Sequence, residues 1–370
     1  MSLISLIFSP CLGRATVETL PVIDLSDQAC IGGNVGLRPF RQGGPRLEAE
    51  SLGKKIIYHN YGHGGSGVSL APGSVWYTVN SFLRHCCGLY SGPVAVLGAG
   101  CMGILTAESL SRRGIAVVLY ADSFPKRGFV FKTGTSCITS QVAGGYWMPF
   151  GVDITDQKLH RDMQEESWRY YTQCIRRQIY SGICFRDAYC FGEYNPFAQS
   201  FLPPRIRDDM NPHRVKFKFE CSATVTEVLK FRTISINGEL FLSDVLDALR
   251  KRSNVKVIQR RFDSLENVTA LTEGIVFNCL GLGAGKLFRD DKIVPIKGQL
   301  LYLKPQPDIN SFMFGQGNYG RFSVYPLGNK LAIGLTYEKG KGDLILEEDV
   351  LEKYKAVLGE FYQEHGVLVF

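Results

Sequence analysis

The segment Val94-Ala-Val-Leu-Gly98-Ala-Gly100-Cys-Met-Gly103 decides the fold predicted for this chain. Its apolar start predicts a strand, and the G-x-G-x-x-G spacing predicts a dinucleotide-binding turn that opens a helix. Gly98 allows the tight turn, Gly100 lets the backbone approach a pyrophosphate, and Gly103 lets the helix pack closely on the strand. The first helical residues, Cys101 and Met102, offer free N–H groups to the phosphates.

The residues after this turn complete a βαβ unit. We expect a helix over Met102–Arg113, then a buried strand over Ile115–Tyr120, because that strand is almost continuously apolar. Asp122 follows the second strand, where a carboxylate can accept hydrogen bonds from a ribose. Together these features predict nucleotide binding, but they do not separate one dinucleotide from another.

Three further segments are rich in glycine and small hydroxyl residues, which let a backbone approach a flat ring or a phosphate. Two lie downstream of the βαβ unit, Thr133–Pro149 and Asn278–Gly285. The third, Tyr58–Ser69, lies upstream and follows the short motif Gly36-Leu-Arg38-Pro39. A helix is expected from Pro72 to Cys87, where apolar residues recur at helical spacing.

These motifs resemble those of the D-amino-acid oxidase family of FAD enzymes. The resemblance covers nearly the whole chain from Gly32 onward once the order is rotated, because the two upstream motifs close the sequence in that family. It therefore implies a circularly permuted chain. It also implies a Rossmann-like, α/β FAD-binding domain with a parallel sheet, and a mainly antiparallel, α+β substrate domain.

The resemblance assigns residues to both ligands. Arg38 would bind the substrate carboxylate, because arginine is a planar, permanently charged bidentate donor, and the Gly65 carbonyl would accept the substrate amine. Tyr319 falls where the family places a substrate-contacting tyrosine. The implied flavin-contacting residues, beyond those of the turn and Asp122, are Thr135, Ser136, Gln141, Ala143, Gly144, Gly145, Gly281 and Gly64, Gly65, Ser66, Gly67, Val68, Ser69.

The chain departs from the family pattern at two positions. Leu280 stands where the family often has threonine, and Ser323 stands where a second tyrosine is usual. Tyr325 is near, on the strand face expected for Ser323. Arg321 lies between the tyrosine positions, and the sequence leaves two alternatives for it: its side chain points elsewhere, or it adds a positive group that favours an acidic side chain.

The domain organisation follows from these assignments. Residues 1–30 form a preface, with one strand expected around Val22–Leu25. The FAD-binding domain is predicted to be discontinuous over 45–150 and 222–298. The substrate domain is predicted over 31–44, 151–221 and 299–370.

Composition bounds the function classes. The chain has 370 residues and a net charge of +7, with no basic run of nucleic-acid-binding type. Eleven cysteines show no zinc-ligand spacing, and no metal site is predicted. No uninterrupted apolar stretch suits a membrane span. We expect a cytoplasmic enzyme, and the sequence leaves the oligomeric state open, a homodimer included.

The implied reaction is oxidation of a D-amino acid, or of a glycine- or sarcosine-like amine, by hydride transfer to flavin N5. The products are an imino acid and, if oxygen is the acceptor, hydrogen peroxide. The alternatives are a dehydrogenase of the same fold, a flavin-binding protein without amino-acid oxidase activity, and a nicotinamide-dependent enzyme. Leu280 and Ser323 favour the second of these, whereas the motifs at 58–69 and 133–149 argue against the third.

Overall fold

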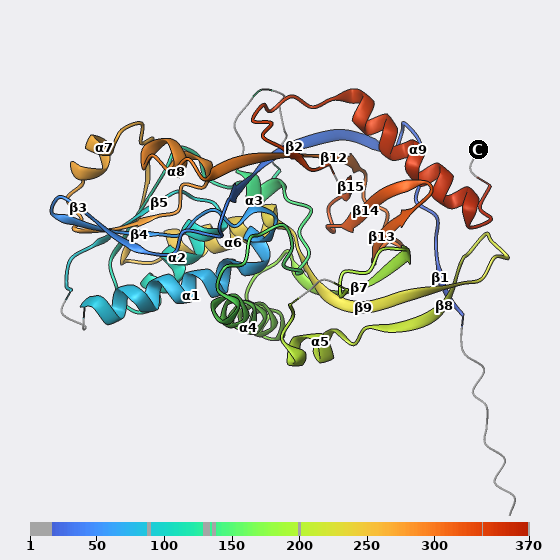
Figure 1. The fold of residues 1–370 in the computed structure, drawn as a ribbon, viewed down its shortest axis with the longest axis horizontal. Helices are drawn as coiled ribbons and strands as arrows, with labels where there is room; N and C mark the ends of the chain where they lie inside the picture. The colour runs from blue at the N-terminus through green and yellow to red at the C-terminus, as the bar shows by residue number, and fades with distance from the viewer. Residues whose placement is uncertain are drawn as a thin grey trace, which may run out of the picture.

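The computed structural model describes residues 17–86, 90–128, 134, 138–198, 201–334 and 336–368. The fold is mixed α/β, as predicted, and consists of two sheets placed end to end (Figure 1). The long strands β2, Cys30–Arg41, and β12, Ile293–Leu303, pair antiparallel to each other and connect the two halves. The ligand-binding motifs of the sequence gather near this connection.

The smaller sheet contains the predicted βαβ unit. It has six strands in the order β10-β6-β5-β11-β4-β3, and neighbouring strands are parallel except for the antiparallel pair β3 and β4. Their bounds are β3 Ala49–Leu52, β4 Lys55–His59, β5 Val94–Leu97, β6 Val117–Ala121, β10 Val255–Gln259 and β11 Ile275–Asn278. The strand β4 precedes β5 in the chain but lies next to β11, on the far side of it from β5.

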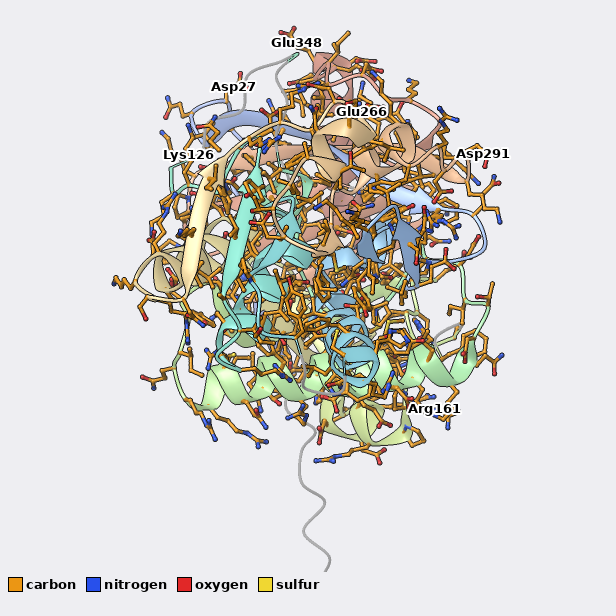
Figure 2. The ribbon with its side chains drawn as sticks, turned by 90° about the vertical axis from the view of Figure 1, so that its left-hand side faces the viewer. Asp27, Lys126, Arg161, Glu266, Asp291 and Glu348 are labelled. Carbon is orange, nitrogen blue, oxygen red and sulfur yellow. The ribbon has the colours of Figure 1, made fainter. Side chains whose placement is uncertain are left out.

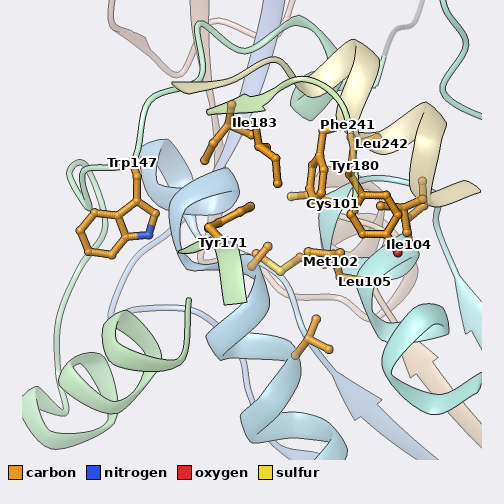
Figure 3. Close-up of a cluster of buried hydrophobic side chains, with 14 of the residues drawn as sticks. Cys101, Met102, Ile104, Leu105, Trp147, Tyr171, Tyr180, Ile183, Phe241 and Leu242 are labelled. Carbon is orange, nitrogen blue, oxygen red and sulfur yellow. The ribbon is translucent and has the colours of Figure 1, made fainter. Parts of the chain in front are cut away.

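Helices cover both faces of this sheet. One face packs on α1 Gly67–Cys86, α2 Cys101–Ser111, α4 Gln157–Arg176 and α6 Gly238–Arg250. Figure 3 shows the centre of this layer, where Met102, Tyr171 and Phe241 from three of the helices meet. The other face packs on the short helices α7 Leu265–Thr269 and α8 Leu282–Leu287.

The larger sheet has ten strands and is mainly antiparallel. Its order is β1-β8-β9-β7-β13-β14-β15-β12-β16, with β2 also paired to β12. The remaining bounds are β1 Glu18–Leu20, β7 Ile183–Gly192, β8 His213–Phe219, β9 Thr226–Ile236, β13 Phe312–Gly317, β14 Gly320–Pro326, β15 Leu331–Gly334 and β16 Glu338–Lys339. The predicted domain boundaries do not follow the sheets everywhere, because β9 lies in the larger sheet although it falls within 222–298.

The C-terminal helix α9, Glu348–Glu364, packs on the larger sheet and closes a second hydrophobic cluster. Two short helices complete the described chain, α3 Thr139–Val142 and α5 Pro204–Met210, with a single 3₁₀ turn, η1, over Gly64–Ser66. Charged side chains such as Lys126, Arg161 and Glu266 lie at the periphery (Figure 2). Among the described helices, none has both the length and the apolar character that a membrane crossing requires.

Two local predictions were wrong. The segment Val22–Leu25 is not a strand, and Ile23 N donates instead to the Tyr362 hydroxyl at 3.1 Å. Helix α1 begins at Gly67 and contains Pro72, which was expected to start it. A proline cannot donate to the carbonyl four residues before it, and the Tyr171 hydroxyl donates to that carbonyl, Val68 O, at 2.7 Å. Tyr171, from α4, therefore supplies the hydrogen bond that Pro72 cannot donate within α1.

Candidate active site

A cavity of about 390 Å³ lies at the carboxyl ends of the parallel strands, and we call it the turn cavity. This is the edge at which open α/β sheets bind ligands. Its walls come from the turns after four neighbouring strands of the smaller sheet, with the start of α1. They include Asn60–Gly65, Gly67, Val68, Gly98–Met102, Ala121–Ser123 and Cys279–Gly283.

The glycines of the turn adopt the roles expected from their spacing. Gly98 has a φ of +100°, and a Cβ there would lie 2.5 Å from the Cys279 carbonyl oxygen. A Cβ on Gly103 would lie 1.8 Å from the Gly98 carbonyl oxygen, so only glycine lets α2 approach β5 this closely. A Cβ on Gly100 meets nothing nearer than 3.5 Å. Gly100 therefore leaves its open side to the turn cavity.

Two helices begin at this cavity. The 20-residue helix α1 and the shorter α2 have their first residues among its walls, and neither has an acidic residue in its first turn. Their free N–H groups and positive dipole ends favour an anionic or carbonyl-rich ligand. The hydroxyl of Ser140 already accepts the Cys101 N–H at 3.0 Å, so α3 is fixed against the start of α2.

His63 adds no charge to the turn cavity. It is buried, and its Nε2 lies 2.8 Å from Ser74 Oγ, which donates to Asn60. Burial lowers the pKa of His63 to about 3. The ring is therefore neutral at physiological pH, as is His59, whose pKa burial lowers to about 4.

A second cavity, of about 410 Å³, adjoins the first, and we call it the arginine cavity. Both are lined by Arg38, Gly65, Val68, Thr139 and Ala143. The Arg38 guanidinium lies over Gly298 of β12, where a Cβ would come within 2.3 Å of its Nη1. Its Nη1 donates to Thr336 O at 3.3 Å, and no carboxylate of the described residues pairs with it. Burial lowers the pKa of this guanidinium, and a bound anion would offset that cost.

Aromatic side chains form part of the wall of the arginine cavity. Tyr146 and Tyr325 line it, and the Tyr146 hydroxyl lies 3.2 Å from that of Tyr194. Burial raises the pKa of Tyr325 to about 12, so its hydroxyl stays protonated. No aspartate, glutamate or histidine is among the described residues that line this cavity. It therefore holds positive charge and hydroxyl donors but no side-chain base.

Most of the predicted site residues meet at these two cavities. The turn residues Gly98, Gly100, Cys101 and Met102 line the turn cavity, together with Asp122, Gly64, Gly67 and Gly281. Gly144, Gly145 and Ser69 line the arginine cavity. Three others lie behind these walls: Gly103 supports the turn, Ser66 Oγ donates to Phe150 O, and Gln141 donates to Lys126 O. Thr135 and Ser136 lie outside the described residues.

Tyr319 is not at the site, contrary to the prediction. It lies in the turn between β13 and β14 and packs under α9, with its ring centroid 5.2 Å from that of Phe361. Its hydroxyl is buried without a partner among the described groups. Because it belongs to the second hydrophobic cluster and lines neither cavity, we remove it from the proposed substrate contacts.

Asn34, Gly298 and Tyr337 are among the residues of the arginine cavity that sequence reasoning missed. Strand alternation was a usable signal for Asn34, which shares a face of β2 with Gly36 and Arg38. The Asn34 Oδ1 atom is buried and has no hydrogen-bond partner among the described groups, and Asn34 lines the arginine cavity. No comparable signal existed for Gly298, because only the pairing of β12 with β2 places it under Arg38.

Comparisons with known proteins agree with the family resemblance. No family model matches the chain. The chain is 26% identical to a D-amino-acid oxidase of Rubrobacter xylanophilus over 263 residues, which cover 69% of this chain and 73% of that protein. It is 24% identical to a D-amino-acid oxidase of Streptomyces coelicolor over 259 residues, which cover 67% and 71%.

Solved structures match less closely. An L-amino acid deaminase from Proteus vulgaris has a TM-score of 0.43 and 14% identity, with 66% of this chain and 60% of that chain covered. A tryptophan 6-halogenase from Streptomyces toxytricini has a TM-score of 0.36 and 12% identity, with 74% and 61% covered. The family resemblance therefore rests on the two sequence relatives alone. The circularly permuted order of the chain stays a prediction. The chain is a D-amino-acid-oxidase-like oxidoreductase.

Proposed function

We propose that the protein is an FAD-dependent enzyme that oxidises the Cα–N bond of an amino acid. The observation that carries this proposal is the Arg38 guanidinium, which faces a cavity without any carboxylate partner among the described residues. The sequence relatives support it, because both are named D-amino-acid oxidase. Dehydrogenase activity towards the same substrates is the alternative.

The turn cavity fits a flavin dinucleotide. The glycines at 98 and 100 and the start of α2 would hold the pyrophosphate, and the exposed Asp122 would bind the ribose. The start of α1 and the segment Ala143–Gly145 would hold the ring system, near the passage between the cavities. A bound flavin supplies the acceptor for two electrons and the Cα hydrogen.

The protein's own residues would bind and orient the substrate. Arg38 would hold the α-carboxylate with two parallel N–H donors, and the Gly65 carbonyl would accept from the amine. The Tyr325 hydroxyl, protonated because burial raises its pKa to about 12, would donate to the same carboxylate. Since no aspartate, glutamate or histidine among the described residues lines the arginine cavity, the amine would have to bind as the neutral form. Positioning and electrostatics, rather than proton transfer by a side chain, would be the protein's contribution.

The test is an anaerobic visible spectrum of the purified holoprotein, recorded before and after addition of amino acids of both chiralities, glycine and sarcosine. We expect flavin absorption that one substrate class bleaches, and loss of bleaching in Arg38→Leu with the flavin still bound. Readmitted air then distinguishes an oxidase from a dehydrogenase. Flavin that no amino acid bleaches would contradict the catalytic proposal, and a protein that never takes up FAD would contradict the cofactor assignment.

A further inference from the structure

A second guanidinium, that of Arg321, lines the arginine cavity. Arg321 lies at the start of β14, and its side chain is exposed at the rim rather than buried. Among the described residues it forms no ion pair, and no acidic residue lines the cavity with it. Among the described residues, the cavity thus has one partly buried and one exposed positive charge, and no acidic side chain lines it.

The strand register explains why Arg321 faces this cavity. Arg321 and Tyr325 lie an even number of residues apart on β14, so their side chains share one face of the sheet, and both line the cavity. The guanidinium carbon of Arg321 lies 5.3 Å from the ring centroid of Tyr194. This cation–π contact holds the guanidinium of Arg321 against Tyr194 beside the cavity.

The two arginines are spaced for a small ligand. Strand β2, which carries Arg38, is separated from β14 by β12 and β15. The two backbones are therefore roughly 14 Å apart, at three interstrand spacings. Both side chains extend from the sheet into the same cavity. Two extended arginine side chains with a short ligand between them can span this distance.

We propose that Arg321 binds the side-chain carboxylate of the substrate, and that the enzyme therefore acts on acidic amino acids. This inference rests on the proposed function and adds its substrate class. Arg38 would neutralise the α-carboxylate, and the remaining positive charge would favour a second carboxylate over a neutral or basic group. An amide side chain of the same shape lacks the negative charge, so aspartate and asparagine form a matched pair of ligands, as do glutamate and glutamine.

The test compares these pairs, in both chiralities, by anaerobic flavin reduction and by steady-state kcat/KM. For the wild type we expect the acid to exceed its amide by roughly 10- to 100-fold, the range for one charge-assisted hydrogen-bonded contact. The variant Arg321→Met should lose this preference, with kcat/KM falling more for the acid than for the amide, whereas Arg321→Lys should retain part of it. Arg321→Glu should transfer the preference to amino acids with a basic side chain.

A control comes from Arg207, which is also exposed and stacks on an aromatic ring, with its guanidinium carbon 5.7 Å from the Phe197 centroid. It lines neither cavity, so Arg207→Met should keep the acid preference. Equal rates for acid and amide in the wild type, or a preference that survives Arg321→Met, would overturn the inference while the proposed function stands. Flavin that no amino acid reduces would instead overturn the proposed function, and this inference with it.

Discussion

Tyr319 and Tyr325 belong to one β-hairpin but to different hydrophobic clusters, and only Tyr325 lines the arginine cavity. We expect Tyr325→Phe to lower kcat/KM by roughly 10- to 100-fold, the effect of one hydrogen bond to a charged carboxylate. Tyr319→Phe should leave kcat/KM unchanged, because its hydroxyl has no partner among the described groups. Steady-state assays with the best substrate measure both, and a larger loss in Tyr319→Phe would contradict this placement.

These tyrosines also show what a single sequence can predict about a residue. The motif around Arg38 predicted a carboxylate-binding role, because few residue types suit bidentate carboxylate binding, and the structure places Arg38 in the wall of a cavity. The assignment of Tyr319 rested on the family resemblance and was wrong, because the residue lies in the turn between β13 and β14 and packs against Phe361 of α9. A motif of consecutive residues was therefore predictable, whereas the position of a single residue at a hairpin turn was not.

His63 predicts how stability depends on pH. Its pKa is lowered by burial to about 3, whereas the pKa of a histidine in the unfolded chain is about 6.5. Between these values the unfolded chain binds a proton that the folded protein does not, so the free energy of unfolding falls as the pH falls through this range. The variant His63→Gln should reduce that slope by up to about 1.4 kcal/mol per pH unit, measured by denaturant unfolding from pH 7 downwards. An unchanged slope would mean that this ring is not a buried neutral group.

At the scale of the element, the strand–turn–helix at β5 and α2 gives a paired prediction. Gly103→Ala places a Cβ 1.8 Å from the Gly98 carbonyl oxygen, so α2 must move away from β5. We expect this variant to lose several kcal/mol of unfolding free energy, as overpacking against backbone does. Gly100→Ala meets nothing nearer than 3.5 Å and should fold normally, but its Cβ faces the turn cavity and should weaken FAD binding. Thermal melts and flavin titration separate the two effects, and equal behaviour of both variants would contradict these roles.

Elements of the smaller sheet were more predictable than those of the larger one. A parallel strand with helices on both faces reads as a continuous apolar run, and β5 and β6 lie where such runs predicted them. The order of the larger sheet depends on pairs that are distant in the chain, such as β7 beside β13. Nothing local encodes such a pairing, because the residues concerned meet only after long loops close.

At the scale of the whole molecule, the segment before the turn motif behaves as though it followed the rest of the chain. It supplies β4, which lies next to β11, and β2, which pairs with β12. The C-terminal region lies close to the start of this segment: Ile23 N donates to the Tyr362 hydroxyl, and Lys355 pairs with Asp27 at 2.8 Å. Both contacts are at one end of the larger sheet, near the beginning of β2. This arrangement supports the permuted order, since it requires only a short new connection between the C-terminal region and β2.

We therefore expect a rearranged gene to encode an equivalent protein. In it the chain would begin at Tyr90, continue to Leu368, pass through a flexible linker to Val17, so that β1 and the contacts of Ile23 and Asp27 are kept, and end at Cys86. The cut falls in the short connection between α1 and β5, and rearrangement at such connections usually preserves a fold. The expected result is the same flavin spectrum, a melting temperature within a few degrees of that of the original protein, and the same substrate preference.

A second rearrangement, which opens the chain within β12 at Gly298, serves as the control. It should not fold, because β12 pairs with β15 and with β2, and because Gly298 lies directly under the Arg38 guanidinium. Failure of the first protein, with folding of the second, would show that the N-terminal segment is an integral start of this fold rather than its displaced end.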